Sequence, residues 1–257
     1  MKKTLLPILL CLLFVPMAAG KASAQTADEV VEKVLTALGG RDALSKITSR
    51  RSFGTIVVTN ANGDIPGTVE VDAKAPNKSR THLELDLTAL GMPDKMIIDQ
   101  KFDGVNGSSV NSMQGDQELT ANQLQNAKNN LFPNVLLNYK AAGITVELLP
   151  KETVAGKSYL VLKSTPKEGS ALKIYVDSDT YLPAKSVTKV DLPQLGEVEQ
   201  TVELSDYRAV DGVKVPFRTT NSNAVQTAKF TYTKIEHNVD LPDALFRKAS
   251  TPAPASR

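Results

Sequence analysis

Residues 81–87, Thr-His-Leu-Glu-Leu-Asp-Leu, alternate between side chains suited to a core and side chains suited to water. Side chains of a β-strand point to opposite faces in turn, so this pattern predicts a strand of a half-buried antiparallel sheet. Residues 197–204, Glu-Val-Glu-Gln-Thr-Val-Glu-Leu, repeat the pattern. Further strands are expected near residues 50–60, 66–73, 95–102, 144–149, 157–164, 170–177, 183–190, 213–220 and 226–235, roughly eleven in all.

Short connections join most of these predicted strands. Asn62-Gly63-Asp64 and Asp211-Gly212 are typical turn sequences and lie between neighbouring strands. Strands joined in this way favour a meandering antiparallel sheet over a sandwich with long crossovers. The sequence therefore predicts an all-β fold in residues 25–249, which we expect to form a single domain, with a flexible tail at residues 250–257.

Two helical regions interrupt the strands. In residues 27–47, Thr26 and Glu29 predict a capping box, and residues 42–47 predict a second short helix after Gly39-Gly40. In residues 119–142, Thr120 predicts a helix start, and Phe132-Pro133 ends that helix. Pro133 is also suited to begin another short helix that stops at Gly143. Apolar helices set across a β shell suggest a hollow beneath them, so we expect both regions to act as a lid.

The lid and the hollow are predicted from their apolar side chains. The lid is expected to cover the hollow with Leu124, Ala127, Leu131, Phe132, Leu136 and Leu137. Apolar residues of the alternating strands can line a cavity for flexible acyl chains, although ordinary core packing is the alternative for each one. The candidates are Val69, Val71, Leu83, Leu85, Leu87, Met96, Ile98, Val146, Leu172, Ile174, Val198 and Val202.

Residues 1–24 have the features of a secretory signal peptide. Two lysines precede an apolar run, and Ala22-Ser23-Ala24 is a small-residue cleavage site, so cleavage is expected after Ala24. The alternative, a membrane anchor, needs a longer apolar run than residues 5–19 provide. Cys11, the only cysteine, lies in this segment, and the mature chain is expected to be a thiol-free periplasmic protein.

Charge argues against some partners. Removing Lys2, Lys3 and Lys21 lowers 30 basic residues to 27 against 28 acidic ones, a net charge of −1. A mixed surface without a basic stripe argues against nucleic acid and against strong attachment to anionic headgroups. We expect a monomer.

Catalytic and metal-binding patterns are scarce. His82 and His237, the only histidines, are far apart in the sequence, and both are expected to be exposed. Asp72, Asp86 and Asp99 are expected on strand faces or in turns, like Asp103. The sequence predicts no metal, no cofactor and no enzyme activity, although a pair of carboxylates distant in sequence can still meet in the fold.

Several short motifs resemble the LolA/LolB-like superfamily of periplasmic outer-membrane lipoprotein-sorting proteins, and most closely its longer, less characterised branch. In order, they are residues 38–40 with 43–44, 75–78, 102–104, 154–157, 174–177 with 181–183, 205–216 and 228–232. The resemblance implies an open antiparallel half-barrel closed by short helices, a concave apolar face that receives lipoprotein acyl chains, and no cofactor or catalysis. The family's prototype carrier has a lid-latching arginine where this chain has Ala75, and the nearby Arg80 is not its equivalent.

We therefore expect a periplasmic carrier or chaperone that holds acyl chains of lipoproteins or other lipids. Its partners would include an inner-membrane donor and an outer-membrane acceptor protein. A lipid-sensing or protein-interaction module of the cell envelope is the main alternative. A β domain filled by its own core is the third possibility, and a hydrolase with facing buried carboxylates is the fourth.

Overall fold

The computed structural model describes residues 25–92, 94–192 and 195–248. The predicted signal peptide and the predicted tail lie outside these residues. Within them, none of the helices has the length and apolar character needed to cross a bilayer.

One antiparallel sheet of 13 strands contains every strand of the described chain. Its spatial order is β6-β5-β4-β3-β2-β1-β13-β12-β11-β10-β9-β8-β7, so the first half of the chain meanders outward from β1 and the second half meanders back to it. This confirms the predicted all-β, antiparallel meander. The strands are β1 Ser49–Asn60, β2 Gly63–Lys74, β3 Lys78–Asp86, β4 Lys95–Phe102, β5 Gly107–Asn111, β6 Gly115–Glu118, β7 Thr145–Val154, β8 Lys157–Thr165, β9 Leu172–Asp177, β10 Pro183–Leu192, β11 Gly196–Val210, β12 Val213–Ser222 and β13 Thr227–His237.

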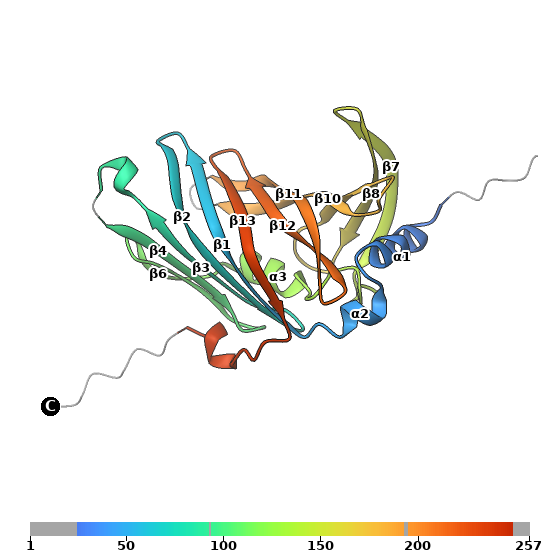
Figure 1. Cartoon of the computed structure of the whole chain (residues 1–257), viewed down its shortest axis with the longest axis horizontal. Helices are drawn as coiled ribbons and strands as arrows, with labels where there is room; N and C mark the ends of the chain where they lie inside the picture. Colours follow the sequence, from blue (N-terminus) through green and yellow to red (C-terminus); the bar gives the residue numbers. More distant parts are fainter. Residues whose placement is uncertain (1–24, 93, 193–194, 249–257) are drawn as a thin grey trace, which may run out of the picture.

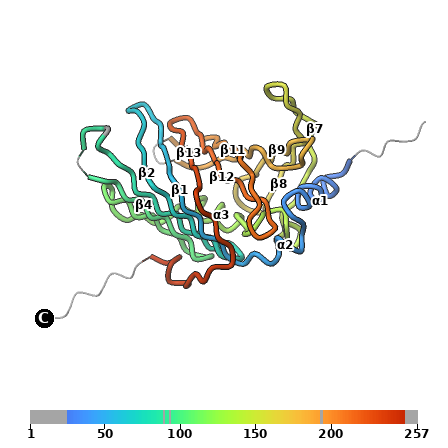
Figure 2. The backbone as a smooth tube through the Cα atoms, in the orientation of Figure 1, coloured from blue at the N-terminus to red at the C-terminus, as the bar shows by residue number. Residues whose placement is uncertain are grey.

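The sheet curls into an open half-barrel. In Figure 1, β1, β13 and β12 lie in front, and the two arms of the sheet turn backward on either side of the α3 helix, Ala121–Asn129. The helices α1, Ala27–Ala37, and α2, Arg41–Ser45, lie at the end of the arm that contains β7. The 3-10 helices are η1, Thr88–Leu90, and η2, Asp243–Phe246, which contacts β3 and β4; the red part of the tube in Figure 2 shows η2 below the lower ends of the strands.

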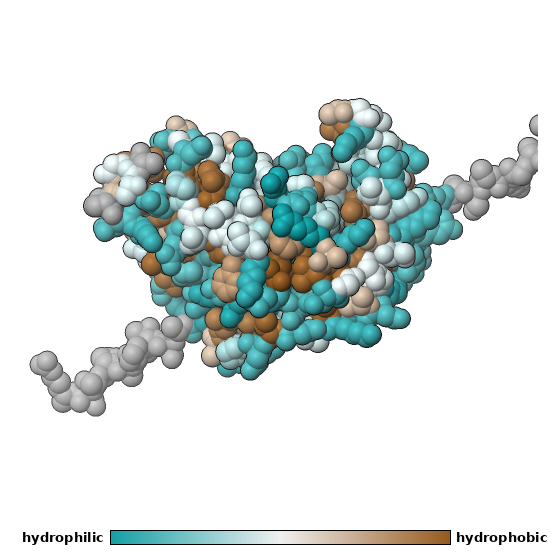
Figure 3. Space-filling view, viewed as in Figure 1, coloured by the Kyte–Doolittle hydropathy of each residue, from teal (hydrophilic) through white to brown (hydrophobic). Residues whose placement is uncertain are grey.

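The strand register gives the sheet one apolar face, which we call the inner face. Residues directly opposite in paired strands share a face. Val58 is opposite Ala228, and the same line of partners continues through Val202 to Ile174. The predicted lining residues all share this face when the alternation along each strand is followed. The view in Figure 3 shows mostly hydrophilic side chains, with hydrophobic ones gathered over the lower ends of β12 and β13.

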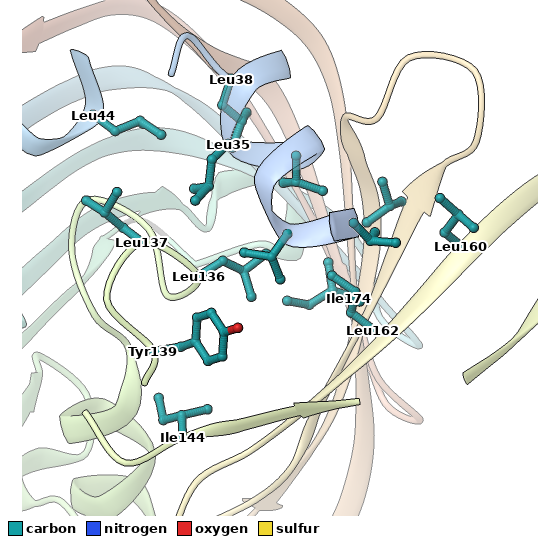
Figure 4. Packing of buried hydrophobic residues seen from close by; sticks show 14 of the residues in the cluster. Leu35, Leu38, Leu44, Leu136, Leu137, Tyr139, Ile144, Leu160, Leu162 and Ile174 are labelled. Carbon is teal, nitrogen blue, oxygen red and sulfur yellow. The ribbon is translucent and has the colours of Figure 1, made fainter. Parts of the chain in front are cut away.

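Two apolar clusters cover parts of the inner face. The first joins α1 to β8 and β9 and includes Leu136, Leu137 and Tyr139. Figure 4 shows Leu35 of α1 directed toward Leu136 and Leu137, with Leu38, the residue that follows the helix, in the same cluster. The second cluster lies on β1, β2, β3 and β13 and includes Ile56, Val69 and Leu85.

Local sequence signals position the helices. Thr26 and Glu29 form the predicted capping box of α1, with N-to-O distances of 3.1 and 3.2 Å. Thr120 and Gln123 form the same arrangement at the start of α3. Both predicted helix starts are confirmed.

The second helix expected after Pro133 is not formed, because residues 134–143 make a series of turns instead. Asn134 explains part of the difference, since its side-chain oxygen accepts a hydrogen bond of 2.8 Å from the Leu136 N–H. Asparagine side chains compete in this way with the helical pattern of backbone hydrogen bonds.

The strands β5 and β6 were not predicted. β6 has the sequence Gly-Asp-Gln-Glu, and all of its side chains are exposed. β5 has only one large apolar residue, Val110. Neither strand carries the apolar alternation by which the others were recognised, so the count is 13 instead of roughly eleven.

Candidate functional site

A cavity of about 200 Å³ lies between the inner face and the segment that follows α3. Its sheet wall includes Leu172, Ile174 and Leu204, and its other side is closed by Leu44 of α2 and by residues 132–136. The wall is largely apolar. Tyr207 also contributes, and its hydroxyl donates a 2.7 Å hydrogen bond to the Pro183 carbonyl, which keeps a polar atom in the wall satisfied.

The structure places the predicted lining residues in three groups. Leu172 and Ile174 line the cavity, and Val146 packs in the same cluster. Val198 and Val202 are half-buried on β11 and belong to neither apolar cluster. The remaining residues share the second cluster, on the other arm of the sheet: Val69, Val71, Leu83, Leu85, Leu87, Met96 and Ile98.

The predicted lid residues divide into two parts. Leu136 and Leu137 are 1% and 5% exposed and form part of the first cluster, while Leu131 and Phe132 pack against it. Phe132 and Leu136 also line the cavity. Leu124 and Ala127 of α3 are half-buried and lie in neither cluster, and none of the described α3 side chains is fully buried.

Hydrogen bonds hold the turn segment against the body of the protein. The Phe132 N–H donates to the Pro76 carbonyl over 2.7 Å, and Arg41 of α2 donates to the Leu137 carbonyl over 2.7 Å. Asp28 of α1 accepts hydrogen bonds from both Lys140 and Tyr139. The bond from Lys140 is the main cause that lowers the pKa of the Asp28 carboxyl. Residues 137–140 are therefore tied to α1 and α2.

The α3 helix is attached differently, through asparagine side chains at its surface. Asn122 donates to Asp191 of β10 over 2.6 Å, and Asn129 donates to the Glu168 carbonyl over 2.7 Å. Asn126 accepts a hydrogen bond from the Ser170 N–H over 3.0 Å. Few apolar contacts accompany these bonds, so α3 can separate from the sheet at a smaller cost than residues 136–139.

Two basic side chains in the cavity wall come from the central strands of the sheet. Arg50 of β1 lies opposite His237 of β13 in the strand register, and both residues line the cavity. The guanidinium carbon of Arg50 lies 5.5 Å from the centroid of the Phe132 ring, within the range of a cation–π contact.

The prediction for His237 is wrong, since this residue was expected to be exposed in a polar turn. β13 continues through residue 237, and the His237 side chain is only 2% exposed. Burial lowers its pKa, and the nearby positive charge of Arg50 lowers it further. His82 does lie on the polar face of its strand, 3.7 Å from Glu84, as predicted, but with 25% of its side chain exposed it is only half-exposed.

Several solved structures have a fold similar to that of this chain. A LolA superfamily protein from Nitrosomonas europaea superposes with a TM-score of 0.54 at 18% identity, covering 88% of this chain and 99% of that one. A domain from Vibrio parahaemolyticus described as an outer-membrane lipoprotein-sorting protein gives a TM-score of 0.54 at 9% identity, covering 85% and 97%. A DUF1329 family protein from Desulfovibrio piger gives 0.54 at 12% identity, covering 86% and 97%.

The chain has a LolA-like fold. This confirms the architecture that the sequence resemblance implied. A family model described as an uncharacterized protein matches residues 138–250. None of the curated proteins matches the chain.

Position 75 is where the family resemblance places a lid-latching arginine, and this chain has Ala75 there. Ala75 supplies only backbone contacts there, since its N–H donates to the Thr48 carbonyl over 2.9 Å. Arg80 lies on the outer face, where its side chain pairs with Asp99 over 2.8 Å, so it is directed away from the cavity. The described contacts that hold residues 132–140 against the rest of this LolA-like fold include those of Pro76, Arg41, Asp28 and Arg50, and none of these involves the side chain of residue 75.

The carboxylates considered for chemistry lie away from the cavity. Asp72 is fully buried on the outer face, where it pairs with Arg51 over 2.6 Å and with Arg80 over 3.6 Å. Asp86 and Asp103 accept hydrogen bonds from turn N–H groups. In the part of the chain that the structure describes, no three histidine or acidic side chains are grouped to hold a metal ion.

The sequence analysis did not predict several residues that line the cavity, among them Leu204, Tyr207 and Arg50. The sequence could have indicated the position of Arg50. Arg50 is separated by an even number of residues from Ile56 and Val58, whose side chains are buried. Side chains at such a spacing in a strand point to the same face, which here is the inner face of the LolA-like sheet.

Proposed function

We propose that this protein binds acyl chains of lipoproteins or other lipids in its cavity and carries them through the periplasm toward the outer membrane. The observation that supports this most directly is the apolar cavity between the inner face and residues 132–136. Transfer of an acyl chain out of water gains about 0.8 kcal/mol per methylene, or roughly 10 kcal/mol for a long chain before entropic costs. A container of this kind lets a lipid cross an aqueous compartment.

Part of the segment that lies over the inner face, residues 121–136, has to move before a long chain can enter, and we call the moving part the cover. The cavity of about 200 Å³ is smaller than the roughly 300–1,000 Å³ of typical small-molecule sites. We assign the movement to α3 and residues 130–133, because α3 has no fully buried side chain and is held mainly by hydrogen bonds of asparagines. Displacing it would extend the cavity along the inner face toward the second cluster. Seven of the twelve predicted lining residues belong to the second cluster, whereas Val146 lies on β7, at the opposite edge of the sheet.

A carrier must be able both to bind its acyl ligand and to release it. The closed and loaded states must lie within a few kcal/mol of each other, since a ligand shifts an equilibrium only by its difference in affinity for the two states. The proposed periplasmic location depends on the predicted signal peptide. The donor in the inner membrane and the acceptor in the outer membrane are part of the same proposal.

The test begins with native mass spectrometry of the protein purified from the periplasm of its own cells. A co-purifying lipid or acylated protein supports the proposal, and uptake of a neutral acyl probe by the purified protein supports binding independently. A clean apo mass together with no uptake of the probe would overturn it.

A matched pair of variants then locates the binding site. Leu204→Trp places a large ring in the cavity wall, so uptake of the neutral probe should fall at least about tenfold, while Leu195→Trp, at a position 54% exposed, should leave it unchanged. If the two variants bind the probe equally well, the cavity is not the binding site.

A further inference from the structure

Arg50 stands apart from the other arginines whose contacts the structure gives. Arg41 pairs with Glu32, Arg51 with Asp72, Arg80 with Asp99 and Arg208 with Asp206, at distances of 2.6 to 2.8 Å. Among the described residues, no carboxylate forms an ion pair with Arg50, and its guanidinium instead faces the Phe132 ring. Arg50 is therefore a half-buried cation in the cavity wall that has no counter-ion among the residues that the structure describes.

The surroundings of Arg50 make this arrangement costly. Burial lowers the pKa of Arg50, which means that the cavity disfavours its positive charge. A cation–π contact compensates only in part for the loss of hydration, whereas a carboxylate or phosphate accepts two parallel hydrogen bonds from a guanidinium. An anion entering the cavity would supply the missing partner.

The neighbours of Arg50 do not fill that role. His237 lies opposite it in the register, and the His237 Nδ1 atom is buried without a hydrogen-bond partner. Asp211 approaches that atom at 3.4 Å, but its side chain is 64% exposed and belongs to the turn outside the cavity. Tyr232 lies near Arg50 on the inner face, but its phenol is uncharged at physiological pH and burial raises its pKa further, so it supplies no negative charge. The cavity therefore offers one guanidinium without a carboxylate partner among the described residues, next to the buried imidazole of His237.

The character of the cavity wall changes along the sheet order. Leu172, Ile174 and Leu204 line it on β9 and β11, while Arg50 and His237 line it on the central strands β1 and β13. Lys185 of β10 also lines the cavity, but its ammonium group lies 4.0 Å from the centroid of the Tyr175 ring. A ligand that satisfies both parts of the wall has an alkyl chain and a single anionic head within reach of the guanidinium.

We infer that the cavity selects acyl ligands with an anionic head, a carboxylate or a phosphate, and that Arg50 binds this head while the chain lies on the apolar wall. This inference rests on the proposed function, because it names the class of acyl ligand that the same cavity takes. Phe132 then has a second role, since a head that binds Arg50 replaces its contact with the ring and favours the displaced position of the cover.

The test compares ligands with the same chain length and different heads. Palmitate carries a carboxylate, hexadecyl phosphate carries a phosphate, and hexadecanol is the neutral reference. A charge-assisted hydrogen bond predicts that the wild-type protein binds at least one of the anionic ligands roughly 10- to 100-fold more tightly than hexadecanol. The ligand with the larger advantage identifies the source of the head.

Arg50→Gln should reduce the advantage of the anionic head, measured as the ratio of anionic-ligand to hexadecanol affinity within the same variant, to about twofold or less, while Arg50→Lys should keep part of it. A change in the ease of opening affects all three ligands alike and leaves this ratio unchanged. Arg218→Gln on β12 is the matched control, because that arginine is 65% exposed, and it should behave like the wild type. Thermal unfolding of each variant establishes that it is folded. If Arg50→Gln does not fold, the wild-type preference and Arg50→Lys still decide the matter.

The failures are distinguishable. Equal affinity of the folded wild-type protein for all three ligands would overturn the inference and leave the proposed function standing. An anionic preference that persists in folded Arg50→Gln would also overturn the assignment to Arg50. Absence of binding for all three ligands would overturn the proposed function itself.

Discussion

Leu35 has no exposed surface and lies where α1 meets the turn segment and the inner face. Leu35→Ala should lower the free energy of unfolding by roughly 2–5 kcal/mol, because it removes buried methyl groups and leaves a void in a packed cluster. Urea unfolding measures this change. Leu195→Ala, the same substitution at a site 54% exposed, should change stability by less than about 0.5 kcal/mol. Equal effects at the two sites would contradict the packing described for α1.

The buried imidazole of His237 predicts a dependence of stability on pH. Its pKa lies below the ordinary value of 6.5 because of burial and the nearby Arg50, so the unfolded chain binds a proton more readily than the folded protein. The free energy of unfolding should therefore fall as the pH decreases below about 6.5 and should lack this contribution above it. Urea unfolding between about pH 7.5 and 5.5 measures the slope, in a range where most carboxylates stay ionised. His237→Gln should have a smaller slope, and identical slopes would show that His237 does not contribute.

Arg50 and His237 also show what sequence reasoning lacks at the residue scale. The parity of Arg50 along β1 was available from the sequence, but its meaning depends on knowing which face the helices cover. The position of His237 depends on where β13 ends, and strand ends are poorly determined by sequence patterns. Their pairing joins residues 187 positions apart through the register of β1 and β13, which no local pattern encodes.

At the scale of elements, α1 and α3 have the same kind of cap and different amounts of burial. Thr120→Ala removes the side-chain cap of α3 at a cost of about 1 kcal/mol. Because no α3 side chain is fully buried, this cost should appear as local opening. Amide hydrogen exchange in residues 124–129 should accelerate about fivefold, and the global free energy of unfolding should hardly change.

Thr26→Ala is the matched comparison, since Thr26 caps α1 in the same way. The buried residues of α1 tie it to the first apolar cluster, so the loss of about 1 kcal/mol should appear in global unfolding. A global loss of the same size from Thr120→Ala would mean that α3 is part of the cooperative core and cannot serve as a separable cover.

The sequence was informative about elements with strong periodic or capping signals. The capping boxes at Thr26 and Thr120 are visible as residue types at fixed spacing, and both helices begin there. The hairpin of β5 and β6 was missed because its stability comes from pairing with β4 and not from apolar alternation. The helix expected after Pro133 failed because the side chain of Asn134 satisfies a backbone N–H that the helix would have used.

For the whole molecule, the apolar alternation predicts a sheet but not how its two halves meet. The pairing of β1 with β13 joins the first and last strands at the centre of the sheet, and it brings both apolar clusters onto one continuous inner face. Contacts of such long sequence separation follow from the complete fold and not from local patterns. The cavity, which takes residues from β1, β9 to β13 and the segment after α3, is a property of that complete arrangement.

The central claim is that an acyl chain enters beneath a cover formed by α3. Asn122→Cys with Asp191→Cys allows a short, reducible, thiol-reactive cross-linker to join α3 to β10 where a 2.6 Å hydrogen bond joins them now. The chain's only cysteine, Cys11, lies in the predicted signal peptide, so the mature protein brings no competing thiol. Thr59→Cys with Asp64→Cys is the control, because a hydrogen bond of the same length joins these residues across the β1–β2 hairpin.

The decisive measurement is the uptake of a neutral acyl probe by each cross-linked protein before and after the linker is reduced. We expect the α3–β10 cross-link to abolish uptake, reduction to restore it, and the hairpin cross-link to leave it unchanged throughout. Undiminished uptake by the protein with α3 fixed to β10 would contradict the account.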